Sequence, residues 1–271
     1  MILTVSHRTT YRYDAPIRMA VQSLRLTPSL YDGQRVIDWT VAVEDGQKGA
    51  GFRDGAGDWI ESWSLRGPAD RVTVSVTGTV ETADLAGLLT GHRETVNPAV
   101  YLRETPATRS EAALVDLARV ADAGMTTEPL VRAHALAACV SEAIAYRPGV
   151  TKAHTTAAEA LALGEGVCQD HAHILIAAAR IMGIPARYVS GYLHATEDGT
   201  PHEAAHAWAE LWIDGLGWIG FDPANRACPD ERYIRLGSGL DARDAAPIRG
   251  MAQGPGRETL DVTVAVAQGQ Q

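Results

Sequence analysis

The amino-acid sequence predicts an α+β protein, in which a β-sandwich-like region precedes a core with a helix packed on an antiparallel sheet. Three observations support this class. Short alternating runs separated by glycine, proline and aspartate fill roughly the first 80 residues, a spacing typical of sandwiches. Helical periodicity then runs from Leu114 to Met182, and strand-like alternation returns at Ala186. We therefore predict an N-terminal β domain at residues 1–84 and a second domain at residues 85–271.

The N-terminal region contains several runs rich in valine, threonine and aromatic residues, which favour strands. The first run is expected to end at Asp14-Ala15-Pro16, and the second stops at Pro28. None of these runs carries a cluster of catalytic residue types. The predicted strands cover residues 2–13, 23–27, 36–43, 59–65 and 72–80.

Helices are predicted in the next part of the chain from apolar residues spaced three and four apart. One helix stops at Gly124, and a second starts near Pro129 and continues to Ile144. Thr156 and Glu159 have the spacing of a capping box for a short helix. A further helix follows Cys168 and is expected to end at Gly183, and the remaining strands are predicted at residues 186–194, 205–213, 218–222 and 260–266.

Charge and composition exclude several classes of partner. The chain has 24 basic and 33 acidic residues, a net charge of −9, which disfavours nucleic acid and anionic membrane surfaces. No apolar run approaches the roughly 18 residues needed to span a bilayer, and no signal peptide is evident at the N-terminus. Three scattered cysteines do not form a disulfide framework, so we expect a cytoplasmic protein.

The stretch from Gly164 to Arg180 places one cysteine, Cys168, directly before an apolar helical run. A cysteine at a helix N-terminus faces unsatisfied N–H groups and the positive end of the helix dipole. Both favour the thiolate over the thiol. The same N–H groups can stabilise an oxyanion, and Gly164 and Gly166 leave the approach to the thiol open. The stretch therefore predicts a cysteine nucleophile.

His206 and Asp222 lie on two predicted strands that are joined by Asp214-Gly215-Leu216-Gly217. In an antiparallel hairpin the two side chains share a face if an odd number of residues is looped out. Pairing Trp212 with Leu216 puts Asp222 opposite His206, and pairing Trp212 with Trp218 puts it diagonal to His206. Either register lets the carboxylate orient the imidazole, which completes a possible Cys-His-Asp triad.

These residues belong to motifs that resemble the bacterial transglutaminase-like cysteine protease family. The resemblance covers most of the chain and implies a papain-like core at 155–226 within a catalytic domain, with Cys168, His206 and Asp222 as its triad. The family usually has phenylalanine where this chain has His171, and threonine where it has Ala224; residues 239–244 also depart from the family pattern. The matching motifs are residues 166–173, 183–192, 206–208 and 217–225 of the core, 7–16 and 24–28 of the N-terminal β region, and 246–250 near the C-terminus.

The triad implies thiol-dependent acyl chemistry on the amide bond of a peptide or protein, without a cofactor or a metal. Hydrolysis by a peptidase or amidase is the leading interpretation, and transglutaminase-type acyl transfer to an amine is the alternative. A non-enzymatic binding module on the same fold is a third possibility. The candidate substrate-binding residues are Gln169, His171, Tyr192 and Trp208, and Gln169 is also a candidate donor to the oxyanion.

Two other interpretations of Cys168 compete with its interpretation as a nucleophile. Cys168 alone would ordinarily be an inert buried thiol. Zinc binding is disfavoured because His171 and His173 are two residues apart on a helix, so they point about 200° away from each other. The residues considered for such a site are Cys168, His171, His173, His202 and His206. No calcium-loop pattern occurs in the sequence.

Overall fold

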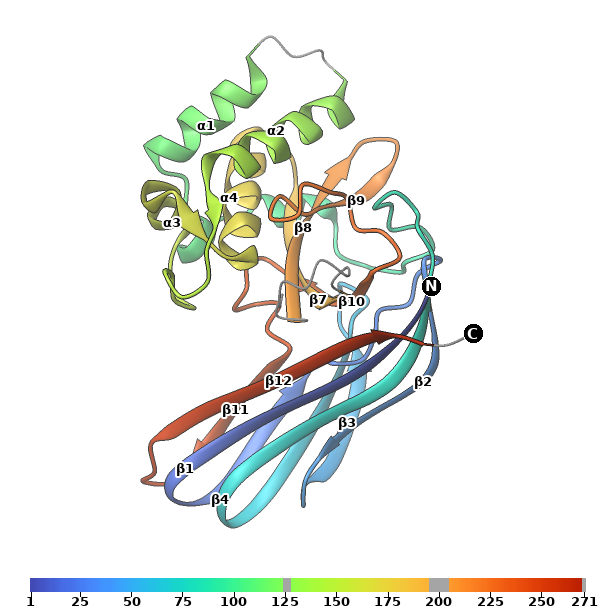
Figure 1. The fold of residues 1–271 in the computed structure, drawn as a ribbon, viewed down its shortest axis with the longest axis vertical. Coiled ribbons are helices and arrows are strands. Elements are labelled where there is room, and N and C mark those ends of the chain that lie inside the picture. The colour runs from blue at the N-terminus through green and yellow to red at the C-terminus, as the bar shows by residue number, and fades with distance from the viewer. Residues whose placement is uncertain (124–127, 195–204, 270–271) are drawn as a thin grey trace.

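A computed structural model describes residues 1–123, 128–194 and 205–269 of the chain (Figure 1). It confirms the α+β class, with a sheet-rich N-terminal region and a core of helices on a second sheet. No helix in the described part of the chain is long and apolar enough to cross a membrane. The helices are η1 (Pro98–Leu102), η2 (Pro106–Thr108), α1 (Ala112–Asp122), α2 (Pro129–Ala143), α3 (Ala157–Leu163) and α4 (Cys168–Ile181).

The N-terminal sheet is built on two long antiparallel strands, β1 (Ile2–Leu24) and β4 (Trp59–Thr82). β2 (Gln34–Val43) and β3 (Gln47–Arg53) pair with β4. The predicted strand 2–13 and the first two residues of the predicted strand 23–27 lie in β1, and the predicted strands 59–65 and 72–80 both lie in β4. The residues Asp14 to Pro16 therefore shift the register between β1 and β4 instead of ending a strand, because proline removes one ladder donor while the chain stays extended.

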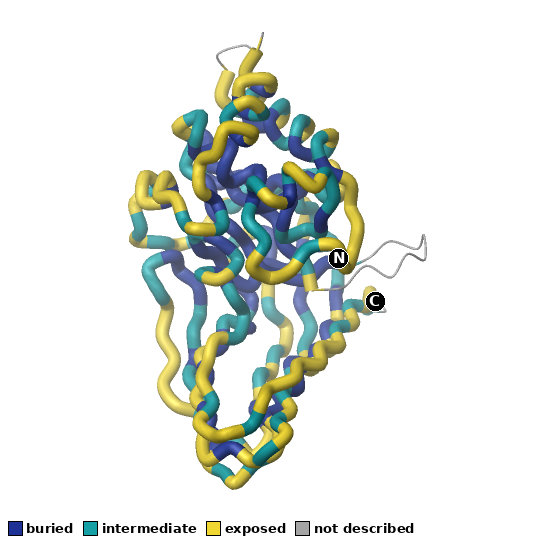
Figure 2. The backbone as a smooth tube through the Cα atoms, turned by 90° about the vertical axis from the view of Figure 1, so that its left-hand side faces the viewer, coloured by how far each residue is buried: buried dark blue, intermediate teal, exposed yellow. Residues whose placement is uncertain are grey.

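Both halves of the bent sheet contribute to one apolar cluster. Leu3 and Val5 come from the start of β1, Leu24 from its end, and Val74 from the second half of β4. Tyr192 and Ile234 of the core also join this cluster. Figure 2 shows that buried backbone is concentrated in the half of the molecule that holds the helices, whereas the far end of the N-terminal sheet is mostly exposed.

The C-terminal strands return to the N-terminal sheet. β11 (Ile248–Gln253) and β12 (Glu258–Gln268) both pair antiparallel with β1, and Figure 1 shows them beside it. The predicted strand 260–266 is thus the central part of β12, and β11 has no counterpart in the prediction. The division of the chain at residue 84 stays a prediction, and these two strands lie in the N-terminal sheet although they follow the core in sequence.

The core sheet has the strand order β10-β7-β8-β9, all antiparallel. Helix α4 packs against β7 and β8, and α1, α2 and α3 pack around α4. Residues 170–180 of α4 are all buried, because small side chains such as Ala177 and Ala178 let neighbouring elements approach closely. The strands are β7 (Ala186–Leu193), β8 (Ala205–Ile213), β9 (Gly217–Phe221) and β10 (Tyr233–Gly239), and a short parallel pair joins β5 (Ala145–Tyr146) to β6 (Glu165–Gly166).

A buried ionic network joins the core sheet to the N-terminal region. Arg235 of β10 contacts Asp58 at 2.8 Å and Glu210 of β8 at 2.8 Å. Glu210 also contacts Arg187 of β7 at 2.7 Å, and Arg187 contacts Glu94. Buried charges are costly unless they are paired, so this network fixes how the two regions meet.

Candidate active site

Cys168 is the first residue of α4, and local hydrogen bonds define the turn before it. Gly164 ends α3 in the left-handed region, with a φ of 70°, where glycine is favoured. Asp170 Oδ2 accepts a hydrogen bond from the Val167 N–H at 2.8 Å and from Thr151 Oγ1 at 2.6 Å. Gly166 passes so close to Asp170 that an added Cβ would lie 2.7 Å from its side chain. These contacts hold the partly buried Cys168 side chain at a defined helix N-terminus.

The β8–β9 hairpin adopts one of the two predicted registers. Trp212 pairs with Trp218 and Ile213 with Gly217, so the three residues Asp214 to Leu216 are looped out. Continuing this register puts Asp222 opposite Trp208 and diagonal to His206. His206 Nε2 lies 2.6 Å from Asp222 Oδ2. The carboxylate therefore holds one ring nitrogen of His206 and leaves the other to face a second partner.

The Cys168 side chain is the second group that acts on His206, because it raises the pKa of the imidazole together with Asp222. Burial by itself lowers the pKa of His206, but the hydrogen bonds to Asp222 and Cys168 outweigh it and raise the pKa to about 10. His206 is therefore protonated at neutral pH. A protonated imidazole next to a thiol is half of a thiolate–imidazolium pair.

Asp222 is held by donors that the sequence analysis did not identify. Tyr233 Oη donates to Asp222 Oδ2 at 2.8 Å, and Asn225 Nδ2 donates to the same oxygen at 2.7 Å. The Ala224 N–H donates to Oδ1 at 3.1 Å. Burial raises the pKa of Asp222, but the hydrogen bonds, first that from His206, bring it below its ordinary value. Asn225 belongs to the motif of residues 217–225 that the sequence analysis identified. Nothing in the sequence around Tyr233 indicated that it would contact Asp222.

Trp208 lies beside the imidazole and not on an open surface. Its side chain is buried, and its ring is stacked on that of His206 with the centroids 6.4 Å apart. It also packs edge-to-face against Tyr233, at 5.5 Å. Trp208 therefore lies at the site predicted from the sequence, where it supports the ring of His206.

Tyr192 is not brought to this site. In the register of β7 and β8, Gly191 is the residue opposite His206, so Tyr192 points to the other face of the sheet. Its hydroxyl lies 2.7 Å from His7 Nδ1, and its ring belongs to the apolar cluster of the N-terminal sheet. This placement does not fit the predicted substrate contact, because alternation along the strand turns the side chain away from His206.

Gln169 and His171 both lie in the first turns of α4, and each side chain makes a hydrogen bond to a backbone carbonyl. Gln169 Nε2 donates to the Ala153 carbonyl at 3.3 Å. His171 is buried and donates through Nδ1 to the Val167 carbonyl at 3.0 Å. Burial lowers the pKa of His171, although nearby carbonyls and Asp222 oppose this shift. His171 therefore braces the turn before Cys168 and does not line an open pocket.

The histidines considered as zinc ligands have separate partners. His171 contacts Val167, whereas His173 Nε2 accepts a hydrogen bond from the Ala242 N–H at 3.0 Å. Within residues 1–123, 128–194 and 205–269, no group of three or more histidine, cysteine or acidic side chains converges on one position. His202, another of the residues around Cys168 in the zinc interpretation, lies outside the described residues.

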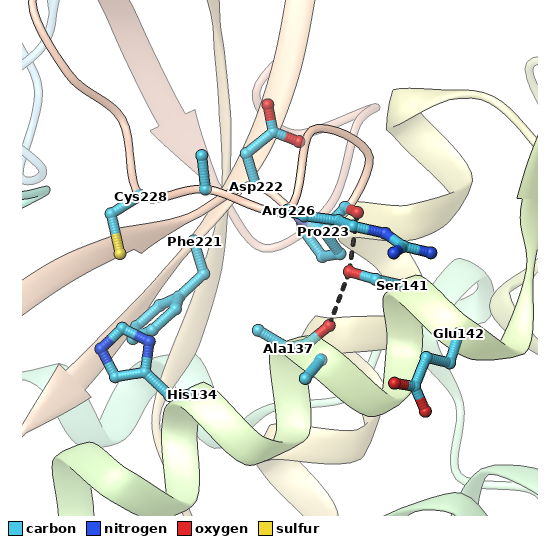
Figure 3. A pocket seen from close by; sticks show the side chains of 11 residues that line it. His134, Ala137, Ser141, Glu142, Phe221, Asp222, Pro223, Arg226 and Cys228 are labelled. Atoms are coloured by element: carbon cyan, nitrogen blue, oxygen red, sulfur yellow. Dashed lines mark hydrogen bonds between the residues drawn. The ribbon is translucent and has the colours of Figure 1, made fainter.

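A cavity of about 340 Å³ lies behind the loop that carries Asp222 (Figure 3). Helix α2 forms one wall, and Ser141 Oγ contacts the Pro223 carbonyl at 2.8 Å. In Figure 3 the Asp222 carboxylate points away from the side chains of His134 and Glu142. The cavity is therefore a neighbour of the triad and does not contain Cys168.

Comparisons with known proteins identify the family to which the chain belongs. The sequence pattern of the Transglutaminase-like superfamily matches residues 117–223, and that of the Bacterial transglutaminase-like N-terminal region matches residues 3–81. An uncharacterised protein of Mycobacterium leprae is 33% identical over 98% of both chains. A protein-glutamine gamma-glutamyltransferase of Pseudomonas aeruginosa is 31% identical to this chain over 100 residues. The aligned part is 33% of this chain and 14% of that protein.

One solved structure shows the same fold over the whole chain. A Cytophaga hutchinsonii protein, provisionally described as a cysteine protease, superposes with a TM-score of 0.73. The superposition covers 100% of this chain and 92% of the Cytophaga hutchinsonii chain, and the two sequences are 21% identical. At this identity the likeness concerns the fold alone.

Proposed function

The chain belongs to the transglutaminase-like superfamily, in its bacterial form with the characteristic N-terminal region, and from this we propose that it is a thiol-dependent enzyme acting on amide bonds. Cys168 is the nucleophile, His206 the general acid and base, and Asp222 the group that orients His206. Hydrolysis of a peptide or protein, through an acyl-enzyme, is the reaction that we favour.

The observation that carries this proposal is the contact of His206 with Asp222, whose Oδ2 lies 2.6 Å from the imidazole Nε2. Asp222 and Cys168 together raise the pKa of this imidazole. The thiolate attacks the carbonyl carbon, and His206 gives its proton to the leaving amine. Water, deprotonated by the now neutral His206, then attacks the thioester carbon and releases the acid.

Acyl transfer to an amine is the second candidate, because the same three residues support it. The P. aeruginosa relative is named a protein-glutamine gamma-glutamyltransferase, which favours this alternative. The two reactions differ only in whether water or a primary amine attacks the acyl-enzyme.

We also propose that the protein acts in the cytoplasm on a peptide or protein substrate. Its three cysteines are all free, which fits a reducing compartment. Its net charge of −9 supports a substrate other than nucleic acid.

Incubation with a peptide library, with and without a primary amine, tests the reaction. Cleavage without amine incorporation, detected by mass spectrometry, is the expected result, and incorporation in place of cleavage would establish transfer. Cys168→Ala is expected to abolish either product while its circular dichroism stays unchanged. Cys139→Ala is the matched control, since Cys139 lies in α2, where burial raises its pKa. Equal activity of Cys168→Ala and the unaltered protein would refute the proposal.

A further inference from the structure

A second cavity, of about 620 Å³, lies in the N-terminal region, and none of the candidate triad residues lines it. Its walls come from residues 30–36, from residues 53 and 57 after β3, and from residues 91–93 of the connector that precedes the core. Cavities of this size commonly hold a small molecule. The proposed acyl chemistry makes no use of this cavity.

Backbone contacts fix the walls of the cavity relative to one another. The Thr95 N–H donates to the Gly55 carbonyl at 2.8 Å, which joins the connector to the turn after β3. Gly57 has a φ of 83°, and a Cβ at this position would clash with the Arg93 carbonyl oxygen, so glycine permits the close approach of the two segments. The cavity is therefore shaped by interactions within the protein.

The His92 side chain, which also lines the cavity, joins the walls by two further hydrogen bonds. Its Nδ1 lies 3.1 Å from the Leu30 carbonyl oxygen, and its Nε2 lies 2.7 Å from the Ala56 carbonyl oxygen. Carbonyl oxygens only accept, whereas a neutral imidazole donates from one nitrogen alone. Both bonds form only when the ring is protonated on both nitrogens, so this geometry favours a positive charge on His92.

The cavity also gathers arginine side chains. Arg35, Arg53 and Arg93 line it, and Asp32 is the one acidic residue among the described residues of its lining. Arg35 Nε donates to Glu81 Oε2 at 2.7 Å. The Arg93 side chain makes no hydrogen bond or ion pair with the residues that the structure describes. Like charges repel, so this excess of positive charge, in a chain with a net charge of −9, favours a bound anion.

We propose that this cavity binds a small molecule through a phosphate group, which Arg53 and Arg93 contact and the charge of His92 attracts. A terminal phosphate carries up to about two negative charges and three acceptor oxygens, whereas a single carboxylate carries one charge. The planar fork of a guanidinium group matches the geometry of phosphate oxygens. The site lies apart from the triad, so the inference does not rest on the proposed function.

Isothermal titration calorimetry of the full chain with inorganic pyrophosphate tests this site. We expect saturable binding, and binding at least about tenfold weaker in Arg93→Gln, because a charge-assisted hydrogen bond is lost. Arg93→Lys keeps the charge but lacks the planar fork, and it should weaken binding less. Arg18→Gln is the matched control, because it removes another exposed arginine, from β1, that does not line the cavity. It should bind pyrophosphate as the unaltered protein does, and so should Cys168→Ala.

Citrate, which carries carboxylates and no phosphate, tests the chemical class of the ligand, and we expect it to bind more weakly than pyrophosphate. Tighter binding of citrate would overturn the assignment to phosphate. Absence of pyrophosphate binding to the unaltered protein at millimolar concentration would overturn the inference. So would equal affinities of Arg93→Gln and Arg18→Gln, since the binding would then be a general attraction to positive surface charge.

Discussion

Asp222 accepts hydrogen bonds on both of its carboxylate oxygens, and this sets the geometry of the candidate triad. His206, Asn225 and Tyr233 all contact Oδ2, while backbone N–H groups contact Oδ1. A carboxylate that accepts several bonds stays ionised and has little freedom to rotate. The imidazole is thereby held in one orientation, with Trp208 stacked against it.

Tyr233→Phe tests this arrangement, because it removes one donor to Asp222 without changing the size of the ring. A hydrogen bond to a charged group contributes about 1.5–3 kcal/mol, so we expect acylation by p-nitrophenyl acetate to slow by roughly tenfold or more. Tyr13→Phe, which removes an exposed bond to Glu258, is the control and should react at the unaltered rate. Equal rates for the two variants would show that Tyr233 does not position the triad.

The hairpin of β8 and β9 shows what local sequence pattern predicts well. The alternation around Trp212 and Trp218, with a loop rich in glycine, restricted the register to two choices, and one of them is found. The length of β1 was not predictable in the same way. Asp14, Ala15 and Pro16 are typical turn residues, yet β1 continues through them, because Arg12 and Ile17 on either side pair with β4 and neighbouring strands override local preference.

Contacts between distant parts of the chain could not be predicted from the sequence. Arg235 meets Asp58, and Tyr192 meets His7, although about 180 residues separate each pair. The spacing of apolar residues contains no information about such a pairing. Tyr192 was therefore predicted as a site residue only because it is an aromatic residue on a predicted strand. The triad was predictable because a helix start and a hairpin, both local features, carry its three members.

At the scale of the whole molecule, the buried ionic network connects the two regions. Glu210 contacts both Arg187 and Arg235. Arg235 also contacts Asp58 of the N-terminal region. Burial raises the pKa of Glu210, but the two guanidinium groups outweigh it and lower the pKa to about 2. The carboxylate is therefore ionised throughout the physiological range.

Glu210→Gln should destabilise the protein strongly, because it leaves two buried guanidinium groups with one charge fewer between them. Breaking a buried pair costs about 3–5 kcal/mol, measured as the free energy of unfolding in urea. Asp116→Asn, which breaks an exposed pair with Arg119, is the control and should change stability by less than about 1 kcal/mol. Similar small effects of both substitutions would contradict the structural role of the network.

We propose that His206 and the N-terminus of α4 activate Cys168, and the reactivity of the thiol reports this activation. Labelling with iodoacetamide near neutral pH, followed by mass spectrometry of the peptides, measures this directly. We predict that Cys168 is labelled at least about tenfold faster than Cys139, and that His206→Ala removes most of the difference. Equally slow labelling of Cys168 and Cys139 in the folded, unaltered protein would show that Cys168 is not activated.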